Sequence, residues 1–341
     1  MIKITEGNLL EADAQALVNT VNTVGVMGKG IALQFKQAFP DNFNAYQKAC
    51  KINQVQPGKM FIYKTHLLGS PEYIINFPTK RHWKNKSRIE DIKSGLISLR
   101  NEIINYNIKS IALPPLGCGN GGLDWSEVKP LIIKALEDLN TTVYLYEPSG
   151  QPDPNSMKIG TTKPKMTKAR ALLLLLMEQY RAPGYHLSLL EIQKLAYFLQ
   201  ECGEPLRLNF VKYIYGPYAE NLNHVLIRLE GHYIRGYGDR NSKSEISLFK
   251  DAILEAKEFI SNDKESLKRL EEVKNLIEGF ETPYGMELLA TVHWSIKYGN
   301  NSIMDFDKII NYIHSWNERK KHVFKNNHVK KTMQHLEIFM Y

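Results

Sequence analysis

Two glycine-rich segments, far apart in the sequence, have the residue types of an anion-binding site. Residues 19–32 read NTVNTVGVMGKGIA, and residues 113–125 read LPPLGCGNGGLDW. Each follows a short apolar run and leads into a stretch with helical periodicity. Glycines at such a turn let backbone N–H groups approach a ligand closely, and the following helix N-terminus adds positive partial charge. Two such loops side by side suit a diphosphate, although either loop alone could equally be a structural turn.

Neither loop matches a standard nucleotide motif. The segment GVMGKG at residues 25–30 has no serine or threonine after its lysine and is not GxGxxG, so an ordinary ATPase or dehydrogenase is disfavoured. Lys29, inside this segment, could supply a charge on the phosphate side of the site or could be a solvent-exposed lysine at a helix start.

A basic stretch lies between the two loops. Residues 73–89 contain no acidic residue, while lysines, arginines and a tryptophan gather at residues 80–88. Cations can hold phosphates while an indole stacks on an unpaired base, so Arg81, Trp83 and Lys84 are candidates for binding single-stranded DNA. The net charge of +8 does not by itself indicate nucleic acid, because it is spread over both halves of the chain.

The elements that must position these residues alternate between strands and helices over residues 1–147. We expect strands at residues 2–4, 16–18, 60–63, 73–76, 111–113 and 142–146, and helices near 30–38, 42–52, 87–106 and 126–139. This alternation predicts an α/β domain with a mixed sheet flanked by helices. Residues 148–165 are rich in turn formers and are expected to be a linker.

Residues 166–341 are expected to form a mainly helical second domain. The spacing Ser188-Leu-Leu-Glu191 predicts a capping box, and Pro217 and Pro283 are each placed to begin a helix. Residues 246–260 and 264–278 have helical periodicity, residues 208–215 and 231–235 could be short strands, and Leu172–Leu176 is expected to be a buried helix rather than a membrane anchor.

The sequence shows no metal motif. The three cysteines, Cys50, Cys118 and Cys202, lie far apart without metal-ligand spacing. With no recognisable secretory leader, they are expected to be reduced thiols in a cytoplasmic protein. The histidines of the second half have no cysteine or carboxylate companions at a recognisable spacing. We therefore expect no cofactor and no metal, and a second domain that binds rather than catalyses.

Four short motifs occur in an order that resembles the macrodomain, an ADP-ribose-binding α/β module. They are GNLL at residues 7–10, VNTVN at 18–22, GKGIA at 28–32 and GCG at 117–119. The full GVMGKGIA, NFPTK and PLGCG segments are most similar to the branch of terminal ADP-ribose protein glycohydrolase and the DarG-type antitoxins. The second domain favours DarG-type antitoxins, which oppose a toxin that ADP-ribosylates DNA, and its IQKLAYF and YGPY segments resemble the Panacea antitoxin domain.

The resemblance implies roles for particular residues. Lys80, which ends the FPTK segment, would lie near the distal ribose and act either as an amine nucleophile or as a general acid, and Asn22 would fix the ribose hydroxyls. The residues expected to bind ADP-ribose are Asn8, Leu9, Thr20, Val21, Asn22, Gly28, Lys29, Gly30, Gly117, Cys118, Gly119, Asn120 and Gly121.

The chain departs from its relatives at two positions. Asn8 stands where an acidic residue would accept a hydrogen bond from the adenine amino group, and its carbonyl can still accept that bond. Gly121 stands where the protein-directed glycohydrolase has a catalytic aspartate, and Asp124 cannot be assumed to replace it. An uncharged turn at Gly121 could instead leave space for a nucleobase.

These features predict an antitoxin with two activities. The first domain would remove ADP-ribose from a DNA base, with thymine in single strands expected and guanine the alternative. The second would bind the cognate toxin, with aromatic groups near Tyr215 as anchors, although Tyr215 is itself expected to close a hydrophobic core. Two other hypotheses remain open: a non-catalytic ADP-ribose reader that sequesters the toxin, and a hydrolase of ADP-ribosyl esters on protein.

Overall fold

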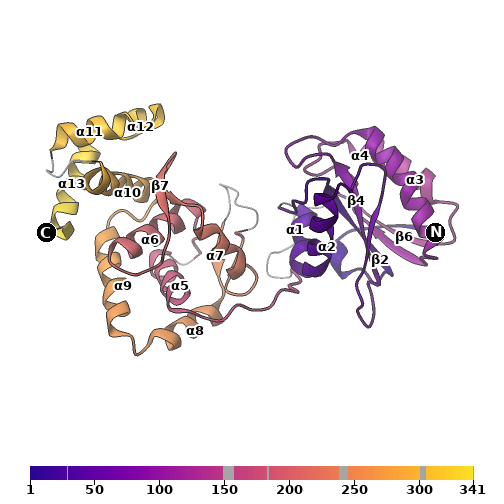
Figure 1. The fold of residues 1–341 in the computed structure, drawn as a ribbon, viewed down its shortest axis with the longest axis horizontal. Coiled ribbons are helices and arrows are strands. Elements are labelled where there is room, and N and C mark those ends of the chain that lie inside the picture. Colours follow the sequence, from indigo (N-terminus) through magenta and orange to yellow (C-terminus); the bar gives the residue numbers. More distant parts are fainter. Residues whose placement is uncertain (29, 149–156, 183, 238–244, 300–304, 341) are drawn as a thin grey trace. The chain divides into compact units, whose positions relative to one another are not determined.

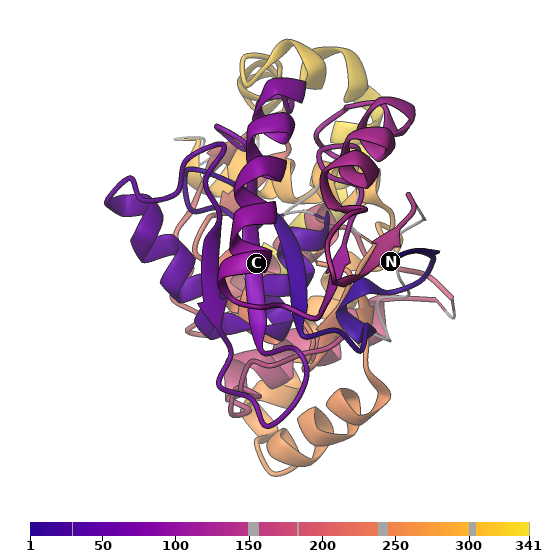
Figure 2. The same cartoon turned by 90° about the vertical axis from the view of Figure 1, so that its right-hand side faces the viewer.

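The computed structural model describes the chain except for residues 29, 149–156, 183, 238–244, 300–304 and 341. The chain divides into two compact units, Met1–Thr162 and Lys163–Tyr341, each with its own buried apolar clusters. The division falls inside the stretch that the sequence marks as a linker. Figures 1 and 2 show the ribbon from two directions.

The first unit is built on a six-stranded mixed sheet with strand order β1-β6-β5-β2-β4-β3. The pairs are parallel except for β3 and β4, which run antiparallel. The strands are β1 (Ile2–Thr5), β2 (Ala16–Asn22), β3 (Phe61–Lys64), β4 (Tyr73–Lys80), β5 (Ser110–Leu113) and β6 (Thr142–Tyr146), and the helices are η1 (Leu9–Glu11), α1 (Gly30–Ala38), α2 (Pro40–Lys51), α3 (Ile89–Asn105) and α4 (Trp125–Leu136).

Helices cover both faces of this sheet, because successive strand residues point to opposite sides. In β2, Ala16 and Val18 belong to the apolar cluster that includes α3 and α4, whereas Leu17 packs with Phe35 of α1 on the other side. The two pairs of helices can be followed in Figure 1. The predicted α/β fold with a mixed sheet between helices is confirmed.

Strand β4 is longer than the sequence predicts and continues to Lys80. Pro78 has no N–H to donate to a neighbouring strand, which argues against a strand at this point. The sheet tolerates it through an irregularity beside it: Val21 pairs with Pro78, and the next residue, Asn22, pairs with Lys80. The irregularity therefore brings the ends of β2 and β4 into register.

Part of the predicted linker packs on the first unit. The N–H of Gly160 donates to the carbonyl of Gln37 at 2.8 Å, and the ammonium of Lys158 lies over the ring of Phe39. A side chain at residue 160 would meet the carbonyl of Ala38 at 2.2 Å, so this close approach requires glycine. The chain thus runs along the end of α1 before it enters the second unit.

The second unit is largely helical, as predicted. Its core joins α5 with α8 and α9, and α6 with α10. Its elements are α5 (Lys168–Tyr180), α6 (Leu189–Glu201), β7 (Phe210–Tyr213), β8 (Gly216–Ala219), α7 (Leu222–Leu229), β9 (Ile234–Arg235), β10 (Ser247–Leu248), α8 (Lys250–Ile260), α9 (Lys264–Ile277), α10 (Pro283–Tyr298), α11 (Phe306–His314), α12 (Glu318–Val323) and α13 (Asn326–Met340).

Some predictions from local sequence patterns in this half are confirmed and one is wrong. The capping box of Ser188 and Glu191 is present, Pro283 begins α10, and the leucines of α5 are buried. The prediction for Pro217 is wrong, because this residue lies in β8 and pairs with Lys212 of β7 in an antiparallel hairpin. No helix in the described part of the chain is long and apolar enough to cross a membrane.

Candidate active site

Three loops of the first unit begin at one edge of the sheet. Strand β2 lies between β4 and β5, and the three run parallel, so their carboxyl ends point the same way. The loops that follow them cover residues 23–28, 81–88 and 114–124. In open α/β sheets, ligands bind in the crevice outside the carboxyl ends of the strands. This edge therefore carries both glycine-rich segments and the basic stretch.

The first loop is folded around the side chain of Asn22. Its amide oxygen accepts hydrogen bonds from the N–H groups of Val24 at 3.0 Å and Val26 at 3.3 Å, and its amide nitrogen donates to the carbonyl of Val26 at 2.5 Å. Gly25, between these residues, has a φ of +77°, which favours glycine. Both polar atoms of the Asn22 amide thus have partners within the loop, and its contact with ribose stays a prediction.

Lys80, at the end of β4, contacts both strand β2 and the second loop. Its ammonium donates a hydrogen bond to the main-chain carbonyl of Asn120, while its backbone pairs with Asn22. Burial removes water from the ammonium and lowers its pKa from the ordinary lysine value. The structure therefore brings Lys80, Asn22 and Asn120 together and makes the Lys80 ammonium easier to deprotonate than that of a solvated lysine.

The second loop has backbone donors without partners, two of them in the exposed residues Gly119 and Asn120. Its turns are closed by hydrogen bonds from Gly122 N–H to the carbonyl of Gly119 at 3.0 Å and from Leu123 N–H to the carbonyl of Gly117 at 3.1 Å. The N–H groups of Gly119, Asn120 and Gly121 have no partner among the described residues. Added to Gly119, a Cβ would meet nothing within 4 Å. Free amides beside open space are what an anionic ligand requires.

The suggestion that Gly121 leaves space for a nucleobase is wrong. A Cβ on Gly121 would lie 2.1 Å from the carbonyl oxygen of Gly117 and 2.4 Å from Oγ of Ser87. Residue 121 thus faces the inside of its own turn, and its carbonyl accepts from Ser87 N–H at 2.9 Å. The loop in this conformation excludes an aspartate here.

Asp124 does not take the place of that aspartate in this structure. Its carboxylate caps the N-terminus of α4, accepting from the N–H of Ser126 at 2.8 Å and from the Ser126 hydroxyl at 2.7 Å. These hydrogen bonds lower its pKa. Lys80 therefore has no catalytic carboxylate partner from this loop.

The other predicted ADP-ribose residues occupy differing surroundings. The side chains of Leu9 and Val21 are buried in apolar clusters, which leaves only their backbones for a ligand. Gly117 is buried, whereas Thr20, Gly28, Gly30 and Cys118 are half-buried and Gly119 is exposed. Gly30, with a φ of +54°, would bring a Cβ to 3.1 Å from the amide nitrogen of Asn120. Lys29 lies outside the described residues.

Asn8 and Cys118 use their side chains within their own segments. The amide oxygen of Asn8 accepts from Leu10 N–H at 3.1 Å, and its amide nitrogen donates to Glu11 at 3.0 Å. One lone pair of that oxygen remains for an adenine amino group. Burial raises the pKa of the Cys118 thiol to about 11, so it stays protonated and unreactive near neutral pH.

The basic segment after β4 presents one aromatic platform. Trp83 is 48% exposed, stacks on His82 with ring centroids 5.4 Å apart, and has the ammonium of Lys84 over its ring. Arg81 instead forms an ion pair with Asp91 at 3.1 Å, and its carbonyl accepts from the hydroxyl of Thr23. Trp83 and Lys84 thus remain exposed beside each other, whereas Arg81 anchors this segment to the first loop and α3.

Sequence reasoning missed a buried amide network beneath the first loop. Asn19 of β2 donates to Asn76 of β4 at 3.0 Å, and Asn76 donates to Asn42 of α2 at 2.7 Å. All three are fully buried. Asparagines within otherwise apolar strands could have predicted such a network, because buried amides need hydrogen-bond partners. The network holds β2, β4 and α2 together where the site loops begin.

The second unit buries several charged groups that have partners. Lys194 donates to the carbonyl of Pro217 at 2.6 Å, and Lys320 donates to Glu287 at 2.7 Å. His293 shares a hydrogen bond with Tyr197, and burial lowers its pKa to about 4. Among the described residues, no three acidic, histidine or cysteine side chains are placed to hold a metal.

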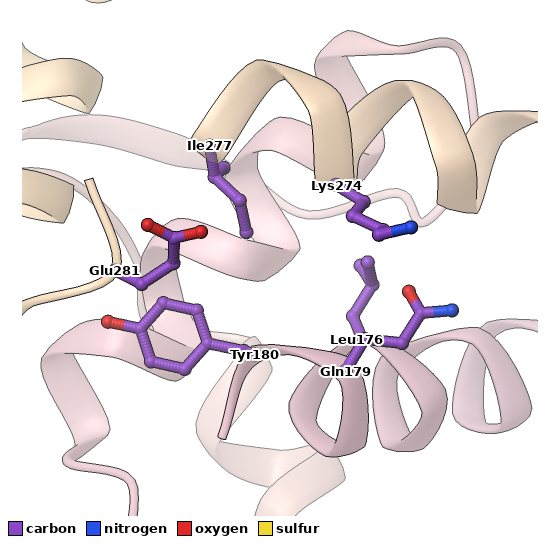
Figure 3. Close-up of a pocket in the computed structure, with 6 residues that line it drawn as sticks. All are labelled: Leu176, Gln179, Tyr180, Lys274, Ile277 and Glu281. Carbon is purple, nitrogen blue, oxygen red and sulfur yellow. The ribbon is translucent and has the colours of Figure 1, made fainter. Parts of the chain in front are cut away.

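A small cavity lies between α5 and α9 of the second unit. Figure 3 shows its lining residues, among them Tyr180, Lys274 and Glu281. Its volume of about 60 Å³ is far below the several hundred Å³ typical of a small-molecule site. Tyr180 uses its hydroxyl for Glu191, at 2.7 Å. This cavity therefore offers no competing site for a nucleotide.

Known proteins resemble the chain over nearly its whole length. The Macro domain family matches residues 18–132. A DNA ADP-ribosyl glycohydrolase of Thermus aquaticus is 51% identical over 331 residues, covering 97% of this chain and 91% of that protein. One from Mycobacterium tuberculosis is 44% identical over 312 residues, covering 86% and 88%. A DNA ADP-ribosyl transferase-DNA ADP-ribosyl glycohydrolase fusion protein of Thermosipho africanus is 40% identical over 162 residues, covering 43% of this chain and 42% of the fusion. The chain, a macrodomain followed by a largely helical unit, therefore belongs to the DNA ADP-ribosyl glycohydrolase family of enzymes.

Proposed function

We propose that the first unit hydrolyses the N-glycosidic bond between ADP-ribose and a DNA base, with thymine in single strands as the substrate. The observation that best supports this proposal is the position of Lys80. It lies where the loop of free amides meets the first glycine loop, and the exposed Trp83 follows it in the chain. The loops would hold the diphosphate, Lys80 would reach the distal ribose, and Trp83 would stack on the base.

Two roles of Lys80 fit this arrangement. As a neutral amine it would attack the anomeric carbon and form a C–N bond as the bond to the base breaks, ring opening of this adduct would give a Schiff base, and water would release ADP-ribose from it. As a cation it would instead donate its proton to the leaving base while water adds to the anomeric carbon. A hydride reducing agent added during turnover distinguishes them. A covalent adduct at Lys80 supports the attack, whereas turnover without an adduct supports proton transfer.

A comparison of two substrates tests the proposal. The full chain is incubated with an ADP-ribosylated single-stranded oligonucleotide and, separately, with protein ADP-ribosylated through ester bonds. We expect free ADP-ribose from the oligonucleotide. Release from the protein alone would instead support an ester hydrolase, and binding without release from either would support a reader.

We propose further that the second unit binds the toxin, an ADP-ribosyltransferase acting on DNA. The fusion protein joins a transferase and a glycohydrolase in one chain, which supports a common assembly. In this chain, the tip of the β7–β8 hairpin exposes Val211, Tyr213, Ile214 and Tyr215, each by 44–54%. The expectation that Tyr215 closes a core is wrong, because its side chain is 44% exposed, with the guanidinium of Arg319 over its ring. Exposed aromatic and aliphatic groups are common anchors at interfaces.

The hairpin is held firmly enough to act as a docking element. Trp316 donates to the carbonyl of Tyr213 at 2.8 Å, and Asn317 donates to that of Ile214 at 3.1 Å. Rigid elements lose less entropy on binding.

Co-purification with the toxin tests this role of the hairpin. The double change Tyr213→Ser with Ile214→Ser should abolish capture. Leu254→Ser with Phe259→Ser, at exposed apolar positions of α8, is the matched control and should preserve it. Equal capture by both variants would exclude the hairpin. Failure of the isolated second unit to bind the toxin would exclude the unit as a whole.

A further inference from the structure

The hydroxyl of Tyr46 lies directly beneath the first site loop. Tyr46 belongs to α2, is fully buried, and packs among Val21, Met27 and Cys50. Its hydroxyl donates to the main-chain carbonyl of Asn22 at 2.7 Å and lies 3.2 Å from the amide oxygen of the same residue. Burial raises its pKa, so this hydroxyl keeps its proton at any working pH.

Tyr46 thereby fixes the residue around which the loop is folded. Asn22 is the hub of three hydrogen bonds to Val24 and Val26. It also pairs with Lys80 immediately after the irregularity in β2. A shift of Asn22 would therefore move the loop backbone and the end of β4 together.

No other group of α2 offers the same link to Asn22. The neighbouring Cys50 thiol approaches the loop at Gly25, where a Cβ would lie 3.5 Å from the Cys50 Cβ, an ordinary packing distance. Burial also raises the pKa of this thiol, so it carries no charge near the site. Among the groups of α2, the hydroxyl of Tyr46 is thus the one that hydrogen-bonds to Asn22.

We propose that Tyr46 is a positioning residue for the hydrolysis of ADP-ribosyl DNA, acting through Asn22 on the geometry between the first loop and Lys80. Being fully buried, it touches no substrate. Small displacements of reacting groups reduce turnover strongly, whereas loops that hold the diphosphate by several backbone contacts tolerate them. Loss of the hydroxyl should consequently lower kcat more than ADP-ribose affinity.

Tyr46→Phe tests this inference, because it removes the hydroxyl and keeps the ring in its apolar surroundings. We expect kcat to fall about tenfold while the Kd for ADP-ribose changes less than about twofold. Tyr106→Phe is the matched control: Tyr106 packs on Tyr73, at the opposite end of β4 from Lys80, and its removal of a hydroxyl should leave kcat unchanged.

A double-mutant cycle with Asn22→Ala separates positioning from a general loss of stability. Asn22→Ala removes the side-chain amide around which the loop is folded but keeps the main-chain carbonyl that Tyr46 also holds. If Tyr46 acts through Asn22, adding Tyr46→Phe to Asn22→Ala should therefore lower kcat by less than the tenfold expected in the parent. Additive losses of kcat, or an unchanged kcat in Tyr46→Phe, would overturn the inference. The inference rests on the proposed hydrolysis, and a parental chain that releases no ADP-ribose would instead count against that proposal.

Discussion

Lys80 in the first unit and Lys194 in the second are alike in two respects and differ in a third. Each donates a hydrogen bond to a main-chain carbonyl, that of Asn120 for Lys80 and that of Pro217 for Lys194. Burial lowers the pKa of both. Lys80, however, lies half-buried beside free amides and open space, whereas Lys194 is fully buried under the β7–β8 hairpin.

The difference shows that a lowered pKa does not by itself identify a catalytic lysine. Lys194 is 1% exposed, and a Cβ on Gly216 would lie 3.4 Å from its ammonium nitrogen. Its hydrogen bond to the carbonyl of Pro217 instead fixes the start of β8 to α6. Access to a ligand, rather than the pKa, separates a lysine of the active site from one of the core.

The largest effect is expected from Lys80→Ala. We expect turnover of ADP-ribosyl DNA to fall by about 100-fold or more, because a positioned acid, base or nucleophile is lost. ADP-ribose affinity should persist, since the glycine loops supply it. Single-turnover kinetics and calorimetry measure the two quantities. Lys194→Met is the matched control and should turn over like the parent, so an equal loss of turnover in both variants would contradict the difference between the two lysines.

Gly119→Glu should do the reverse and remove binding. The side chain has open space, so the loop keeps its fold, and its negative charge lies where a phosphate is expected. We expect ADP-ribose to bind about 100-fold more weakly, in line with the cost of facing like charges. Gly119→Gln, which has the same shape without the charge, is the control for bulk. Parental affinity in the glutamate variant would show that this loop does not hold the diphosphate.

Trp83→Ala should weaken recognition of the DNA part of the substrate. Loss of a stacking platform costs about 1–3 kcal/mol per base, so we expect KM for the oligonucleotide to rise about tenfold. The Kd for free ADP-ribose should not change. Trp83→Phe, which keeps a stacking ring, should recover most of the affinity. If neither change alters the KM for the oligonucleotide, the DNA binds elsewhere on the protein.

The smallest effect concerns the stability of the second unit. The pKa of Lys194 is lowered to about 7, while in the unfolded chain it returns to the ordinary lysine value of 10.5. Between these values the unfolded chain binds more protons, so the free energy of unfolding should rise with pH. We expect more resistance to urea at pH 9 than at pH 7, and a smaller rise in Lys194→Met. The same pH dependence in both chains would assign it to other groups.

Much of the fold could be read from local patterns. The strands and helices of the first unit occur in the predicted order, because each is specified by apolar runs and turn residues within it. Local signals failed at Pro217, where a proline that could begin a helix lies instead in a two-stranded hairpin. They also predicted that β4 ends before Pro78. The strand continues because an irregularity in its pairing with β2 accommodates the proline, and this pairing is not a local feature.

The sequence by itself determined the two glycine loops, the lysine that ends FPTK and the family to which they point, since these are features of neighbouring residues. Only the tertiary structure decided that Lys80 reaches Asn120, that Gly121 faces the inside of its turn, and that Tyr46 holds Asn22. These contacts join residues far apart in the chain. Their distances depend on how strands and helices pack, which no local pattern encodes.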